Sequence, residues 1–222
     1  AIHVARTRRL AAGEPLSRVT AELTARLGIE FSVIPMSDDP VRTFVETTAG
    51  ALAFQHYFVR DQCAPEVTGF EFRGAKTATP SPMALGTLAD PAFDAVVICP
   101  SNPFISIDPI LAVPGLRGAI EEAAAPVIAV SPIVGGKAIK GPTAKMMLEL
   151  GVTQSAASVA RHYDGLIDGF VLDSEDAASG DEIRALGLDV LTTNTVMQSL
   201  EDRVSLAANV LEFATKLRFK SK

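Results

Sequence analysis

The stretch "VVICPSNPFISIDPILAVPG", residues 96–115, decides the fold of this chain. It begins with β-forming residues and changes abruptly to a Pro-Ser-Asn-Pro tip at 100–103. We expect a buried strand over Asp94–Cys99, followed by an irregular loop that has no helix cap. A second stretch, "PVIAVSPIVGGKAIKGP" at residues 126–142, repeats the plan of an apolar strand with a Ser-Pro tip. Two such tips predict a shared pocket at one edge of a sheet.

Downstream of residue 94, short apolar strands alternate with helical stretches. The strands are expected at Asp94–Cys99, Val127–Ser131, Gly169–Asp173 and Leu188–Thr192, and the helices near 115–124, 142–150, 155–162, 176–186 and 196–216. Apolar strands of this kind between helices indicate burial on both faces, and hence a mostly parallel sheet. The right-handed crossover rule then predicts a three-layer α/β/α Rossmann-like sandwich.

The first part of the chain has a different pattern. A helix is expected from Ser17, as its cap, to Leu27, and a strand over "IEFSVIPM" at 29–36. Three antiparallel strands are expected at Thr43–Thr47, Ala51–Val59 and Gly69–Arg73, and a helix near 83–89. We interpret the chain as a single α/β domain over residues 1–222, with a small antiparallel insertion at about 41–75.

Composition restricts the function classes. Hydrophobic residues make up 48% of the 222 residues and charged residues 21%, as in a globular protein. The formal net charge of −6 disfavours nucleic-acid binding by broad charge neutralisation. The longest apolar runs are too short to span a bilayer. We therefore expect no nucleic-acid partner, no membrane partner and a cytoplasmic location.

The two cysteines and the last helix are read as structural. Cys63 and Cys99 have no metal-ligand spacing, and Cys99 is expected to be a small buried core residue. The last helix has one apolar face, which we expect to pack on the core; a share in a dimer interface stays open. That face consists of Val196, Leu200, Val204, Ala207, Leu211 and Ala214.

The two strand tips carry groups that suit a phosphorylated ligand. They offer short hydrogen-bonding side chains, glycine backbone and positive charge. These residues are Ser101, Asn102, Ser106, Gly135, Gly136, Lys137 and Lys140. Neither a Walker A motif nor a G-x-G-x-x-G fingerprint is present. The alternative is that the prolines merely direct an irregular loop, with solvated lysines nearby.

Two further strand tips are weaker candidates. One consists of Asp173, Glu175 and Asp176, which resemble a cluster that binds a metal ion or a ribose. These residues also suit a helix N-terminus, and we favour that role. The segment 192–194 follows the last strand and offers two threonines and an asparagine.

"PSNPFISIDPILAVPGLRGAI" together with "VIAVSPIVGGKAIKGPTAKMMLELG" resembles the CofD family, the 2-phospho-L-lactate transferases of coenzyme F-420 biosynthesis. "RLGIEFSVIPMSDDPVRTFVET" and "SVARHYDGLIDGFVLDSED" support the resemblance, which covers nearly the whole chain. Family members begin with a Gly-rich turn after a first strand and with an acidic stretch, and this chain has neither. The chain thus resembles the later two-thirds of the family, and we expect an N-terminal portion to be missing.

The resemblance implies a specific reaction. Such enzymes transfer a 2-phospholactyl or phosphoenolpyruvyl group from a guanosine diphosphate-linked donor (LPPG or EPPG) to the deazaflavin alcohol FO. GMP leaves, a phosphodiester forms, and Mg²⁺ is used. The family also suggests a homodimer. Whether the donor carries lactate or enolpyruvate stays open, and so does the activity of this chain alone.

The resemblance also assigns residue roles as hypotheses. Lys137 and Lys140 are the catalytic candidates that hold phosphate charge. The donor and its phosphates are assigned to Ser101, Asn102, Ser106, Ser131, Gly135 and Gly136, and the acceptor pocket to Met36, Ser37, Asp38 and Asp39. The two aspartates have an equal alternative as caps of the turn before Pro40. The metal ligand is expected in the absent acidic stretch, so none is named.

Two other functions compete with the transferase. The first is a nucleotide-sugar-binding regulator of the gluconeogenesis-factor type, in the same superfamily. Those relatives carry a Gly-Pro-Gly-Ser type loop in place of "CPSNPFIS" and lack a counterpart of "SPIVGGKAIKGP", so both stretches favour the transferase. The second is a generic Rossmann-like nucleotide hydrolase.

Overall fold

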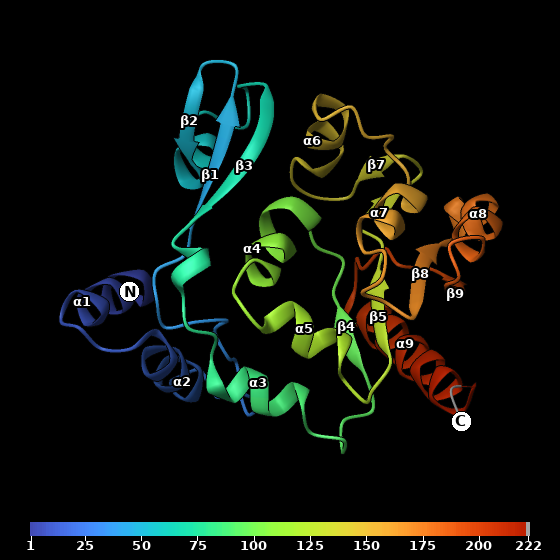
Figure 1. Cartoon of the computed structure of the whole chain (residues 1–222), viewed down its shortest axis with the longest axis horizontal. Coiled ribbons are helices and arrows are strands. Elements are labelled where there is room, and N and C mark those ends of the chain that lie inside the picture. Colours follow the sequence, from blue (N-terminus) through green and yellow to red (C-terminus); the bar gives the residue numbers. More distant parts are fainter. Residues whose placement is uncertain (221–222) are drawn as a thin grey trace.

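The structure, a computed structural model, describes residues 1–220 and contains a parallel four-stranded sheet with helices on both faces (Figure 1). The sheet order is β4–β5–β8–β9, and every neighbouring pair is parallel. The strands are β4 (Val96–Ile98), β5 (Val127–Val130), β8 (Gly169–Asp173) and β9 (Asp189–Thr193). The predicted three-layer α/β/α architecture is confirmed.

The alternation of side chains along the strands builds two core layers. On one face, Ile128, Val130 and Val171 pack against α9 (Leu200–Lys220). On the other face, the neighbouring strand residues belong to one core cluster with residues of α5 (Leu116–Glu121), α6 (Thr143–Glu149), α7 (Ala156–His162) and α8 (Gly180–Arg184). Those neighbours are Val127, Ala129, Phe170 and Leu172. Successive residues of a strand point to opposite faces, so an all-apolar strand requires cover on both.

The predicted core face of α9 is wrong. The side chains that pack on the sheet are Leu206, Val210, Phe213, Ala214 and Leu217, and of these only Ala214 belongs to the predicted stripe. Val204 and Leu211 are 60% and 55% exposed. The helix carries two apolar stripes, and the sheet selects the one with Phe213. That ring closes over Gly169, where an added Cβ would lie 2.8 Å from it.

The antiparallel insertion has the order β2–β1–β3 and stands apart from the parallel sheet in Figure 1. Its strands are β1 (Arg42–Thr47), β2 (Gly50–Ala53) and β3 (Val67–Arg73), which confirms the predicted hairpin and third strand. The second strand ends early, because a π-helical turn, η1 (His56–Arg60), follows and buries Tyr57 completely. The insertion is tied to α6, where the Glu149 carboxylate accepts the Val67 N–H at 3.0 Å.

The first segments are mainly helical: α1 (Ile2–Ala11), α2 (Leu16–Arg26) and, after η2 (Ala75–Thr77), α3 (Pro82–Leu88). The strand predicted over 29–36 is absent from this described segment, where Phe31 is 84% exposed. Its β-forming residues have no neighbouring strand to pair with there, and only Ser37 forms an isolated bridge, with Pro80. Ser17 lies inside the first turn of α2, so its predicted role as N-cap is also wrong.

The tip of β4 differs from the predicted uncapped loop. The Asn102 Oδ1 accepts the backbone N–H groups of Phe104 (2.9 Å) and Ile105 (3.3 Å), and so caps the π-helical turn η3 (Pro103–Ile107). The turn continues directly into α4 (Asp108–Leu111). Cys99 is exposed rather than buried, because β4 forms the edge of the sheet within the described residues.

The segment after β5 forms a two-residue hairpin of β6 (Ile133–Val134) and β7 (Lys137–Ala138). Gly135 and Gly136 have φ values of 56° and 73°, which this tight turn requires. A short 3₁₀ segment, η4 (Ser174–Ser179), joins β8 to α8. None of the helices in residues 1–220 combines the length and apolar character needed to cross a membrane.

Candidate active site

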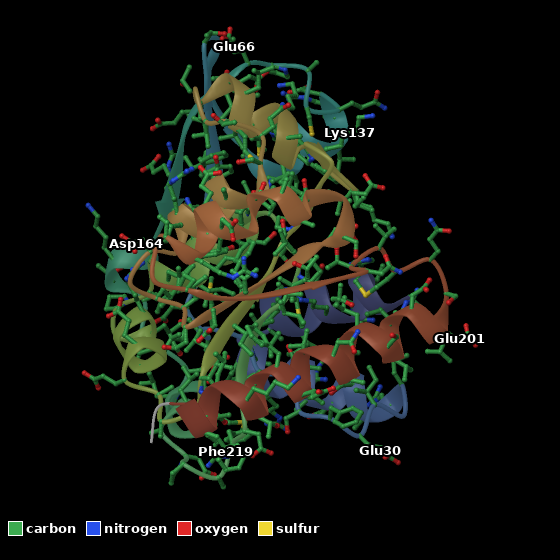
Figure 2. The ribbon with its side chains drawn as sticks, turned by 90° about the vertical axis from the view of Figure 1, so that its right-hand side faces the viewer. Glu30, Glu66, Lys137, Asp164, Glu201 and Phe219 are labelled. Atoms are coloured by element: carbon green, nitrogen blue, oxygen red, sulfur yellow. The ribbon has the colours of Figure 1, made fainter. Side chains whose placement is uncertain are left out.

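A polar cleft of about 140 Å³ lies beyond the carboxyl ends of the parallel strands. Its walls come from the tips of β4, β5 and β9, from the β6–β7 hairpin and from the start of α6. They consist of Pro100, Asn102, Ser131, Pro132, Val134, Ile139, Lys140, Thr143, Thr195, Val196 and Met197. In Figure 2, Lys137 in β7 and Glu201 in α9 lie on the right of the view, whereas Asp164, before β8, and Phe219, near the end of α9, lie on the left. The predicted meeting of the two strand tips is confirmed.

Buried hydroxyl groups form the floor of the cleft. Ser131 and Thr143 are each 2% exposed, and Thr195 is 5% exposed. The Ser131 hydroxyl donates to the Ile133 carbonyl at 2.8 Å and accepts the Ile133 N–H at 3.2 Å. This local turn fixes the direction of the Ser131 side chain.

Asn102 lines the cleft, and the donor capacity of its side chain lies in its amide nitrogen. Its oxygen is occupied by the cap of η3, and its Nδ2 lies 3.3 Å from the Met146 sulfur, a weak acceptor. Asn102 therefore contributes a hydrogen-bond donor, which suits a phosphate oxygen. Ser101 is half-buried and Ser106 is exposed, and neither lines the cleft.

The hairpin separates the two predicted lysines. Lys140 lines the cleft, whereas Lys137 is exposed on the hairpin and lies outside the lining. Gly135 and Gly136 also lie outside it. The Gly135 N–H, predicted to meet the ligand, donates to the Asp176 carboxylate at 3.1 Å.

The predicted acceptor residues, Met36, Ser37, Asp38 and Asp39, are not brought to this cleft. Asp38 binds the first turn of α2. The Asp38 carboxylate accepts the Ser17 N–H at 2.6 Å and the Ser17 hydroxyl at 2.8 Å. The Ser37 hydroxyl donates to the Thr79 carbonyl, and Asp39 accepts the Thr79 N–H at 2.7 Å. Met36 packs in a small cluster with residues around α3. The acceptor role of this segment stays a prediction.

The tip of β8 is a helix N-terminus, as favoured from the sequence. Asp173 is the N-cap of η4 and accepts the Glu175 N–H at 3.0 Å. Burial by itself raises the pKa of Asp173, but hydrogen bonds from Thr195, Glu175 and Ser174 outweigh it and hold the pKa below its usual range. No group of three or more His, Cys, Asp or Glu side chains suited to a metal ion occurs among residues 1–220.

Sequence reasoning missed Thr143 and Thr195, two of the three buried hydroxyls of the cleft. The predicted segment 192–194 stops one residue short of Thr195. Thr143 follows Gly141 and Pro142 at the start of a helix, and this Gly-Pro pattern could have pointed to Thr143 as a helix-start residue. Both residues lie at strand or helix ends that face the same edge.

A second, larger groove adjoins the cleft at Pro100 and Met197 and has a volume of about 500 Å³. Its lining is almost entirely apolar and includes Val97, Cys99 and the exposed side of α9, with Arg203 as its charged residue. Phosphate recognition requires convergent hydrogen-bond donors. The smaller cleft has Lys140, the Asn102 amide and the Thr143 hydroxyl, whereas Arg203 is the charged residue of this otherwise apolar groove.

The sequence matches the family described as 2-phospho-L-lactate transferase CofD over residues 1–210. The chain belongs to the CofD family. It is 40% identical to a phosphoenolpyruvate transferase of Streptomyces griseus, over 98% of this chain and 70% of that protein. It is 38% identical to a 2-phospho-L-lactate transferase of Methanococcoides burtonii, over 94% of this chain and 67% of that protein.

A solved structure has a similar fold. A crystal structure of a UPF0052-family protein from Bacillus halodurans has a TM-score of 0.60 to this chain at 16% identity, covering 92% of this chain and 69% of that one. This similarity shows the fold alone. In this CofD chain, both stretches that carry the family resemblance contribute residues to the polar cleft.

Proposed function

We propose that this chain transfers a 2-phospholactyl or phosphoenolpyruvyl group from a guanosine diphosphate-linked donor to the deazaflavin alcohol FO, in coenzyme F-420 biosynthesis. The observation that carries the proposal is the polar cleft, built by the strand tips of a CofD-family chain and lined by buried hydroxyls, an amide and Lys140. Relatives named as transferases of either group are similarly close in sequence, so the proposal includes both groups.

The reaction is an in-line displacement at phosphorus. The FO hydroxyl oxygen attacks the phosphorus that carries the lactyl or enolpyruvyl oxygen, and a new P–O bond forms. The bond from this phosphorus to the bridging oxygen breaks, and GMP leaves with that oxygen. The hydroxyl proton passes to solvent. Catalysis of this kind depends on positioning and on neutralising phosphoryl charge, not on a covalent protein nucleophile.

Lys140 is the charged residue of the cleft and is assigned to the diphosphate. Asn102 is assigned as a neutral donor to the same ligand. Ser131 and Thr195, whose hydroxyl protons already have acceptors within the protein, are assigned to the shape of the cleft. Lys137, Ser101, Ser106, Gly135 and Gly136 lie outside the lining. Their predicted donor contacts would require a ligand that extends over the rim of the cleft.

The residues of the cleft do not fit a protein-held Mg²⁺. This ion prefers carboxylate ligands, and the side chains lining the cleft are an amide, hydroxyls, a lysine and apolar groups. The nearby Asp173 carboxylate is occupied by hydrogen bonds. Use of Mg²⁺ remains an expectation from the family resemblance, and no step is derived through it. A homodimer and a cytoplasmic location are expectations of the same kind.

The test is to incubate the purified chain with FO and each donor, and to follow GMP and the phosphodiester by mass spectrometry. Formation of both products in equal amounts is expected with at least one donor. Phosphate release without acceptor would indicate the nucleotide hydrolase instead. Binding of nucleotide sugars, with no product and no effect on FO fluorescence, would indicate the regulator.

A further inference from the structure

The acidic tip of β8 holds both walls of the cleft without lining it. Asp173 ends the strand, and Asp176 follows in η4. In the sheet, β8 lies between β5, whose chain continues into the β6–β7 hairpin, and β9, whose chain continues into the wall at Thr195. Each aspartate binds the backbone of one of these two segments.

Asp173 fixes the wall that follows β9. Its Oδ2 accepts the Thr195 N–H at 2.7 Å and the Thr195 hydroxyl at 3.0 Å, and its Oδ1 accepts the Glu175 N–H. Asp173 is 4% exposed and Thr195 is 5% exposed, so water competes little for these bonds. These hydrogen bonds fix both the backbone and the side-chain rotamer of Thr195, which lines the cleft together with Val196 and Met197.

Asp176 fixes the opposite wall. Its Oδ2 accepts the N–H of Gly135, in the turn of the hairpin that leads to Ile139 and Lys140. The neighbouring Glu175 closes on the same turn, since its Oε2 lies 2.8 Å from where a Gly135 Cβ would be. The hairpin therefore rests directly on the segment after β8.

We propose that Asp173 and Asp176 are positioning residues that set the geometry of the donor-phosphate cleft, Asp173 through Thr195 and Asp176 through the hairpin that carries Lys140. The inference rests on the proposed function and goes beyond it, because it assigns these carboxylates to support of the cleft and not to a metal ion or a ribose. Misplacement of catalytic groups by about 1 Å can cost roughly 100-fold in rate.

We expect substitutions of the two aspartates to change the donor KM in different ways. Asp176 needs only an acceptor oxygen for one N–H, so Asp176→Asn is expected to behave as the unchanged protein. Asp176→Ala is expected to raise the donor KM about 10-fold. Asp173 accepts three hydrogen bonds, and an Asn there places an NH₂ group against a donor. Asp173→Asn is therefore expected to raise the donor KM at least as much, with the FO KM unchanged.

The experiment measures kcat and both KM values for the three variants, together with the thermal midpoint. Asp181→Ala is the matched control, because Asp181 is an exposed carboxylate in α8 whose side chain pairs with Arg184. A donor-specific KM effect in Asp173→Asn and Asp176→Ala, restored in Asp176→Asn, supports the proposal. Equal loss in Asp176→Asn and Asp176→Ala would overturn it, because a metal or charge role requires the carboxylate. So would equal changes in both KM values.

A readout without turnover separates this inference from the proposed function. Hydrogen exchange followed by mass spectrometry is expected to show faster exchange at 194–198 in Asp173→Asn and at 133–138 in Asp176→Ala. GDP binding by calorimetry is expected to weaken in the same two variants. If the unchanged protein forms no phosphodiester, the proposed transferase fails, and these two measurements still decide the positioning role. Unaltered exchange in both segments would overturn it.

Discussion

Asp38 caps α2 from a distance of 21 residues along the chain: its carboxylate accepts both the backbone N–H of Ser17 and the Ser17 hydroxyl. Helix N-termini leave their first N–H groups without intrahelical partners, and a carboxylate there also meets the positive end of the helix dipole. The sequence suggested Ser17 as the cap, and Asp38 equally as part of an acceptor pocket or as a cap of the turn before Pro40. The observed pair gives both residues a structural role.

Substitution of Asp38 tests that role. Asp38→Ala is expected to lower the free energy of unfolding by about 1 kcal/mol, the usual cost of a lost N-cap. The measurement is urea denaturation, with Ser17→Ala as the partner variant that removes only one of the two bonds. A raised FO KM in Asp38→Ala without any loss of stability would instead favour the acceptor role.

The two lysines of the hairpin are expected to differ. Lys140 lines the cleft and Lys137 does not, so Lys140→Ala should weaken donor binding about 10-fold to 100-fold, the range for a hydrogen bond to a charged group. Lys137→Ala should change it less than about 3-fold, in keeping with an exposed charge. Calorimetry with GDP checks both. Equal losses would mean that the donor reaches past the cleft to the turn.

The packing of α9 can be tested by two substitutions on its opposite faces. Phe213→Ala is expected to cost about 3 kcal/mol or more in stability, since the ring is buried against Gly169. Leu211→Ala removes a side chain that is 55% exposed and is expected to cost within about 0.5 kcal/mol. Denaturant unfolding measures the loss of stability in both variants. A larger loss in Leu211→Ala than in Phe213→Ala would show that the apolar face predicted from the sequence is the buried one.

The cysteines should label at different rates. Cys99 is exposed at the end of β4, whereas burial raises the pKa of the Cys63 thiol and lowers its thiolate fraction at neutral pH. Maleimide is therefore expected to react first at Cys99, with Cys63 catching up as the pH rises. The single variants Cys63→Ser and Cys99→Ser identify each site. Preferential labelling of Cys63 would contradict the edge position of Cys99.

The contribution of Asp173 to the free energy of unfolding is expected to depend on pH. Its folded-state pKa lies below the unfolded value of about 3.9, so its ionised form stabilises the fold above that value. This contribution is lost as the pH falls through the folded-state pKa. Asp173→Asn should therefore be less stable than the unchanged protein at pH 7, and the difference should shrink in acid. Unfolding at a series of pH values checks this, with Asp181→Asn as an exposed control.

The strand and helix order from residue 94 onward was predictable because it depends on local patterns. Runs such as Val127–Val130 are short, rich in β-branched residues and apolar at every position, which indicates a strand covered on both faces. The meeting of the two strand tips followed from the same pattern, since parallel strands end at one edge. The residues that line the cleft were predicted only in part. The sequence pointed to Asn102, Ser131 and Lys140, but not to Thr143 and Thr195.

The sequence by itself therefore determined the parallel α/β core and the edge at which the candidate site lies, because both depend on side-chain periodicity over a few residues. The tertiary structure alone decided which stripe of α9 is buried, that Asp38 caps a helix, and that Asp173 and Asp176 hold the two walls of the cleft. Each of these depends on a partner far away in the chain. Which distant donor a carboxylate meets, or which of two apolar stripes a sheet covers, is set by packing and leaves no local signature.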